Sequence, residues 1–254
     1  MRRTMLRSMF LLVLLSAILS ACGTPSLAQS GNPGQIPTPP PAPTYAPEPE
    51  PAIPAAPAAT LPRAGAQTLA ADTFDSALDA WDVLDLRVEG ASEPSLWQAT
   101  NGRVDQVTGP DGNRGEISSF LLKGDLGWGD YSVRAAVYPR GNGNVGLVGR
   151  ASDAGLYVFG MRPSDSTQGY NITLHRYDAA TESFTLLSKT DTGGLKPNAW
   201  AALELRFQGD SIQALIDGKE VLTATDGTHK SGRAGLYAYA EGNVSFDNFS
   251  VQTN

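Results

Sequence analysis

The chain has 254 residues, a formal net charge of −7 and one cysteine. The acidic balance disfavours nucleic acid and anionic surfaces as partners, because both repel negative charge. A single cysteine excludes internal disulfide bonds, so the folded part must be stabilised by packing or by a bound ion.

Residues 1–21 have the layout of an export signal. Three arginines come early, an apolar run extends from Met9 to Leu19, and the small residues Ser20 and Ala21 follow. The apolar run is shorter than the roughly 20 residues that span a bilayer comfortably. We therefore predict a signal peptide over 1–21 that is removed after export. The alternative is an N-terminal anchor helix.

The four residues Leu19-Ser20-Ala21-Cys22 resemble the lipobox of bacterial lipoproteins at every position. The resemblance implies that the thiol of Cys22 receives a diacylglyceryl group and that the new N-terminus is acylated as well. Two or more acyl chains anchor a protein stably, whereas one chain does so only marginally. We therefore expect a lipid bilayer as partner, with the chain on the extracytoplasmic face of the cell membrane. The alternative is a soluble exported protein with an incidental cysteine.

Residues 22–66 differ sharply in composition from the rest of the chain. Of the 18 prolines, 13 fall between Pro25 and Pro62, and large apolar residues are scarce there. Such a segment buries too little apolar surface to offset the entropy lost on ordering. We predict a disordered linker of polyproline II character that can extend on the order of 100 Å, at about 3.1 Å per residue.

Residues 67–254 show the pattern of an all-β domain. Short runs alternate apolar with polar residues, as in Tyr131–Tyr138, where every second side chain is apolar. Turn residues separate the runs, and Asp217-Gly218 indicates a tight hairpin. Many short strands at regular spacing are typical of a sandwich or barrel. We predict a two-sheet jelly-roll sandwich over this range.

Five stretches of this domain carry recognisable motifs, namely Trp97 to Gly102, Trp128 to Arg134, Trp200 to Gly218, Gly232 to Tyr237 and Phe246 to Val251. Together they resemble the concanavalin A-like jelly rolls of the LamG and glucanase type. The nearest branch is the 3-keto-disaccharide hydrolase-like family, over about residues 70–252. The resemblance implies the sandwich fold, and it implies a glycoside-acting hydrolase as one functional alternative.

No established catalytic arrangement is present in the sequence. The Glu-x-Asp-x-Glu strand of glucanases is missing, and so is the Gly-x-Ser-x-Gly elbow of serine hydrolases. The chain has two histidines, His175 and His229, and no zinc-ligand spacing. These observations favour a binding protein over an enzyme while leaving catalysis open.

Strand alternation suggests where a ligand could bind. If Ile172 and Leu174 face the core, His175 faces outward, and similar parity arguments apply to the neighbouring strands. Sugar binding needs flat aromatic surface together with polar groups. The alternative is that the aromatic side chains belong to the core and the polar groups are solvated. The predicted ligand-binding patch consists of Arg150, Tyr157, His175 and Tyr237.

A structural calcium ion is a second candidate ligand. In jelly rolls that resemble this one, the first and last strands pair, and an acid near the Phe-Asp-Asn motif binds calcium. The resemblance points to Asp247, with Asp72 and Asp75 as weaker partners. Carboxylates combined with backbone carbonyls suit calcium. The alternative for Asp247 is a side chain that caps a turn.

We therefore predict a membrane-anchored, extracytoplasmic β-sandwich that binds carbohydrate or a cell-envelope partner. One alternative is a glycoside-acting hydrolase. Another is a structural or adhesion module without a small-molecule ligand.

Overall fold

The computed structural model describes residues 52–58, 65–87, 95–107, 117–141, 143–162, 172–191, 193–239 and 243–254. The predicted signal peptide, Cys22 and most of the predicted linker lie outside these residues. The described residues include no apolar helix of membrane-spanning length.

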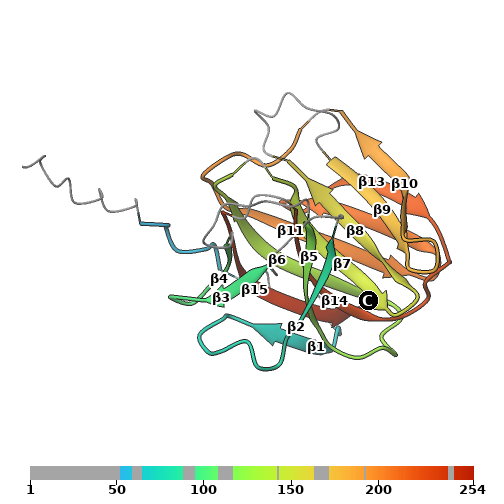
Figure 1. Ribbon diagram of the computed structural model, residues 1–254, viewed down its shortest axis with the longest axis horizontal. Helices are drawn as coiled ribbons and strands as arrows, with labels where there is room; N and C mark the ends of the chain where they lie inside the picture. The colour runs from blue at the N-terminus through green and yellow to red at the C-terminus, as the bar shows by residue number, and fades with distance from the viewer. Residues whose placement is uncertain are drawn as a thin grey trace, which may run out of the picture. The chain divides into compact units, whose positions relative to one another are not determined.

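Two antiparallel sheets form the domain, which confirms the predicted all-β sandwich (Figure 1). The first sheet has eight strands in the order β13-β12-β11-β6-β15-β4-β3, with β1 paired to β15. Its strands are β1 (Thr68–Asp72), β3 (Leu96–Ala99), β4 (Val104–Val107), β6 (Tyr131–Pro139), β11 (Ala201–Gln208), β12 (Ser211–Ile216), β13 (Lys219–Thr225) and β15 (Val244–Thr253).

The second sheet has seven strands in the order β10-β9-β8-β7-β14-β5-β2. Its strands are β2 (Asp82–Arg87), β5 (Ile117–Lys123), β7 (Val145–Ser152), β8 (Gly155–Met161), β9 (Ile172–Asp178), β10 (Ser183–Thr190) and β14 (Arg233–Tyr239).

The core lies between the sheets and is built by strand alternation. On β6 the buried side chains Val133, Ala135 and Val137 point inward, as the sequence pattern predicts. They meet the inward face of the seven-stranded sheet, where Leu147 and Phe159 are fully buried. Burying this apolar surface supplies most of the stability of a domain without disulfide bonds.

The hairpin predicted at Asp217-Gly218 joins β12 to β13. Asp217 and Gly218 both have positive φ, of 49° and 77°, as the tightest hairpin turns require. The backbone N–H of Ala202 donates to the Asp217 carboxylate at 2.8 Å, which ties the turn to the start of β11.

Candidate functional site

The outward faces of the two sheets differ in chemical character. The eight-stranded sheet carries ion pairs there, and Glu204 is held between Arg134 and Arg206. The seven-stranded sheet instead carries a second apolar cluster on its outward face, separate from the main core. Its members are Phe120, Leu122, Val148, Ala151, Leu156, Val158, Tyr177 and Tyr237. An outward face lined with apolar and aromatic residues is what a ligand site needs.

A cavity of about 680 Å³ opens on this face, and we call it the outer groove. Its volume lies within the usual range for small-molecule sites. Aromatic rings, hydroxyls, an imidazole, an amide and two carboxylates share the lining. The lining residues are Asp85, Leu86, Ser118, Asn144, Val158, Gly160, Thr173, His175, Tyr177, Glu182, Phe184, Tyr237 and Tyr239.

The groove floor owes its form to Gly160, which lies in one cross-strand row with Gly146. Strand register places Tyr237 opposite Gly146, Gly146 opposite Gly160, and Gly160 opposite Thr173. A Cβ added at Gly160 would lie 3.1 Å from Cε1 of Tyr237, so the tyrosine ring reaches across β7 to β8. The same ring stacks on Phe120, with centroids 5.3 Å apart. The absent side chain at Gly160 therefore gives the ring room at the groove, whereas a Cβ at Gly146 would meet the backbone oxygen of Phe159 instead.

His175 lies in the row next to the glycines, opposite Val158 on β8. Its ring meets the ring of Phe184 edge-on, with centroids 6.2 Å apart. Burial lowers the pKa of His175 from its ordinary value of 6.5, because the charged imidazolium loses hydration. The imidazole is therefore neutral at neutral pH, with one nitrogen that donates a hydrogen bond and one that accepts.

This pKa shift predicts a pH dependence of stability. Below about pH 6.5 the unfolded chain binds more protons at His175 than the folded chain does. The free energy of unfolding is therefore highest above that pH and falls as the pH drops below it. We expect the urea midpoint to fall as the pH drops from about 7 to 5. His175→Gln should flatten this slope in urea titrations at each pH. An unchanged slope in that variant would contradict the shift.

Two of the four predicted ligand residues line the outer groove, and two do not. His175 and Tyr237 both contribute to its lining. Arg150 is instead one of the most buried side chains, at 1 % exposure. It has a positive φ of 49°, and strand pairing shifts register between Gly149 and Ser152. This β-bulge breaks the alternation on which its outward placement was predicted.

Tyr157 points into the core, contrary to the prediction. The register that places Val158 opposite His175 necessarily turns Tyr157 to the other face. The Tyr157 hydroxyl donates to Asp226 Oδ1 at 2.6 Å. Burial and this hydrogen bond raise the pKa of Tyr157 to about 12. Its observed contacts are structural.

The predicted ligand-binding patch leaves out other residues that line the groove. Tyr177 shares the parity of His175, so strand alternation alone identifies it as outward-facing. Phe184 lies on the edge strand β10, which no clear alternation marks, and it is 45 % exposed. Glu182 precedes that strand in a turn and has a positive φ of 48°. No sequence pattern indicates that Asp85 of β2 reaches the same cavity.

The three predicted calcium ligands do not form one cluster. Asp72 binds Lys123 at 2.7 Å and accepts a hydrogen bond from the indole of Trp81 at 2.9 Å. Asp75 and Asp247 line a different cavity together, and burial and the charge of Asp75 raise the pKa of Asp247. Among the described residues, no three or more His, Cys, Asp or Glu side chains form a group that could hold a metal ion.

Calcium binding at the Asp75 and Asp247 pair stays a prediction, since two carboxylates supply only part of the six to eight oxygens that calcium takes. If calcium binds there, a chelator should lower the melting temperature, and Asp247→Asn should remove this response. An unchanged melting temperature in the natural chain would reject a stabilising ion.

The family model of the 3-keto-alpha-glucoside-1,2-lyase-like domain matches residues 70–252. This range takes in every strand from β2 to β14 and most of β1 and β15. The chain belongs to this family. The predicted resemblance is thus confirmed. No curated protein matches the chain.

Solved structures similar to this lyase-like domain show the same fold at low sequence identity. The carbohydrate-binding module CBM66 from Bacillus subtilis is 14% identical, with a TM-score of 0.52, covering 68% of this chain and 96% of that chain. A galectin-like protein of unknown function from Bacillus subtilis is 11% identical, with a TM-score of 0.54 and coverages of 73% and 96%. Bacillus licheniformis beta-glucanase is 13% identical, with a TM-score of 0.50 and coverages of 72% and 97%.

Proposed function

We propose that this chain is a lipid-anchored, extracytoplasmic module that binds carbohydrate in the outer groove. The observation that carries the proposal is the aromatic floor beneath a cavity lined by hydrogen-bonding groups. Sugars present apolar C–H faces and hydroxyl edges, and these match aromatic rings and polar side chains respectively. The family match and the fold shared with a carbohydrate-binding module support the proposal.

The charges of the groove favour a neutral sugar. Its described lining contains the carboxylates Asp85 and Glu182 and no lysine or arginine. Carboxylates accept hydrogen bonds from sugar hydroxyls and repel anionic groups. Uronic acids and sulfated glycans are therefore expected to bind worse than neutral glycans.

A glycan array with the natural chain tests the proposal, followed by calorimetry on the retained glycans. Phe184→Ala should weaken binding about three- to tenfold, because the half-exposed ring at the groove loses its stacking contact. Leu126→Ala is the matched control, since Leu126 is 56% exposed and lies outside the groove lining. The carbohydrate proposal fails if no glycan is retained or if the two variants bind alike.

Catalysis on a 3-keto-glucoside is a second candidate function. The specific observation is that the neutral imidazole of His175 and two carboxylates share the groove of a lyase-like domain. In a 1,2-elimination a base takes the C2 proton and a C1=C2 double bond forms as the C1–oxygen bond breaks. The departing oxygen keeps the bonding electron pair and takes up a proton, so the leaving group is released as an alcohol. His175 is the candidate base. The reaction should produce an unsaturated ketone that absorbs ultraviolet light, and turnover unaffected in His175→Gln would reject this role.

A further inference from the structure

The last described part of the proline-rich region, Ile53–Ala58, contacts the outward face of the eight-stranded sheet. The indole Nε1–H of Trp200 donates to the carbonyl oxygen of Pro54 at 2.8 Å. The side-chain amide of Asn248 donates to the carbonyl oxygen of Pro57 at 2.9 Å. We call this stretch the docked segment. Two side chains far apart in the sequence thus hold two carbonyls of one short segment.

The docked segment has the spacing of a polyproline II helix. Prolines stand at positions 51, 54 and 57, and polyproline II has three residues per turn. The two carbonyls that accept hydrogen bonds are therefore one turn apart, on one edge. Ile53 and Ala56 have the same spacing and are half-buried, whereas the other residues of the segment are exposed. Polyproline II makes no internal hydrogen bonds, which leaves these carbonyls free to accept from the domain.

The surface beside the docked segment combines small side chains with an aromatic pair. Ala136 of β6 has an outward parity, yet it is only 5% exposed. Ala202 lines the same small cavity of about 30 Å³ beside Pro57. Trp200 packs on Tyr138, with ring centroids 5.2 Å apart. Proline-rich segments generally dock against grooves that aromatic side chains line, and Trp200 with Tyr138 supplies such an aromatic edge here.

The position of Asn248 depends on a β-bulge in the last strand. Asn248 has a positive φ of 52°, and the pairing of β15 with β6 shifts register between Asp247 and Ser250. The bulge places an extra residue at the outward face, where its amide reaches Pro57. The backbone conformation of the sheet therefore positions the side chain that binds the docked segment.

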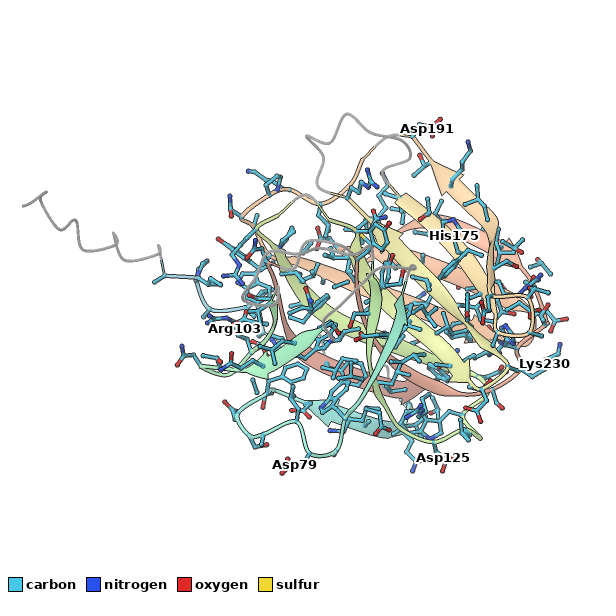
Figure 2. All side chains as sticks on the ribbon, in the orientation of Figure 1. Asp79, Arg103, Asp125, His175, Asp191 and Lys230 are labelled. Carbon is cyan, nitrogen blue, oxygen red and sulfur yellow. The ribbon has the colours of Figure 1, made fainter. Side chains whose placement is uncertain are left out.

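We propose that the docked segment is a polyproline II latch that fixes where the predicted linker leaves the domain. It lies on the outward face of one sheet, whereas the outer groove opens on the outward face of the other. Arg103, which lines the cavity beside the segment, and His175 lie on different sides of the domain (Figure 2). With the latch docked, the predicted linker leaves the domain from the face opposite the outer groove. This holds whatever ligand the groove binds.

Docking within one chain is favoured over docking between copies. Only nine residues separate Ala58 from the first strand, which begins at Thr68. A short connection holds the segment near its receptor at an effective concentration in the millimolar range. A second copy could compete only at comparable concentrations.

Exchange of the Trp200 indole proton in the full chain tests the latch. We expect Pro54→Gly/Pro57→Gly to speed this exchange about tenfold. The glycines remove the preformed conformation of the segment, so the segment undocks and its carbonyl no longer accepts the indole proton. The buried indole of Trp97, which donates to Ser119 at 2.8 Å, is the internal reference and should not change.

The matched control is Pro47→Gly/Pro49→Gly, which removes two prolines upstream of the docked segment. It should leave the exchange of Trp200 unchanged. The latch is rejected if the natural chain exchanges as fast as the Pro54→Gly/Pro57→Gly variant. Protection that rises with protein concentration would also overturn it, since docking would then join two copies.

Discussion

Arg150→Met is expected to lower the free energy of unfolding by about 3–5 kcal/mol, the usual cost of removing one partner from a buried charged network. The guanidinium donates to the backbone carbonyls of Gly129, His229 and Gly209 at 3.1, 3.2 and 2.9 Å. It also pairs with Asp130 at 3.1 Å. Methionine fills similar space but leaves three carbonyls without this donor.

The substitution should separate the loops that Arg150 holds at one end of the sandwich. Because a domain of this size loses about 2–4 °C per kcal/mol, the melting temperature should fall by roughly 10 °C. Arg150→Lys should restore less than half of the loss, since an ammonium group cannot reproduce the planar fork.

Arg206→Met is the matched control for Arg150→Met. Arg206 pairs with Glu204 on an outward face, and its side chain is 22% exposed. Partly exposed pairs contribute about 1 kcal/mol or less, so this variant should melt close to the natural chain. If Arg150→Met kept the stability of the natural chain and lost glycan binding, the structural role would be wrong and Arg150 would be a ligand-binding residue.

Gly160→Val is expected to weaken glycan binding by more than about tenfold. The added Cβ would lie 3.1 Å from Cε1 of Tyr237 and 3.8 Å from Oγ1 of Thr173. The branched side chain therefore displaces the tyrosine ring from the groove floor. Overpacking of this kind typically costs about 1–3 kcal/mol of stability, which leaves the domain folded.

A graded series separates lost binding from lost folding. Gly160→Ala places only the Cβ against the ring, so its glycan affinity should fall between those of the natural chain and the valine variant. Calorimetry gives the affinity, and the melting temperature reports the fold. Equal affinity across the series would show that the sugar does not use this floor.

The all-β fold was predictable because turns and alternation follow from local backbone chemistry. Asp217-Gly218 predicts a hairpin because these residue types adopt the positive φ of a tight turn. Tyr131–Tyr138 predicts a strand because every second residue is apolar and faces inward. Family motifs then identified the type of sandwich. None of these signals depends on how the strands pair.

The binding site was only half predictable, because it depends on register and bulges. His175 follows from alternation along its own strand, whereas Tyr157 needs the pairing of β8 with β9. Arg150 turns inward at a β-bulge where it has positive φ. The neighbouring residues in the sequence do not predict this bulge. The contact of Trp200 with Pro54 joins residues 146 positions apart, beyond any local pattern.

Backbone NMR of the labelled chain, titrated with a glycan retained on the array, tests the carbohydrate proposal most directly. We predict that the largest chemical shift changes fall on the row of Gly160 and Thr173 and on His175, on the outward face of the seven-stranded sheet. Changes centred instead on Ala136 and Ala202, on the outward face of the other sheet, would contradict the assignment of the outer groove as the sugar site.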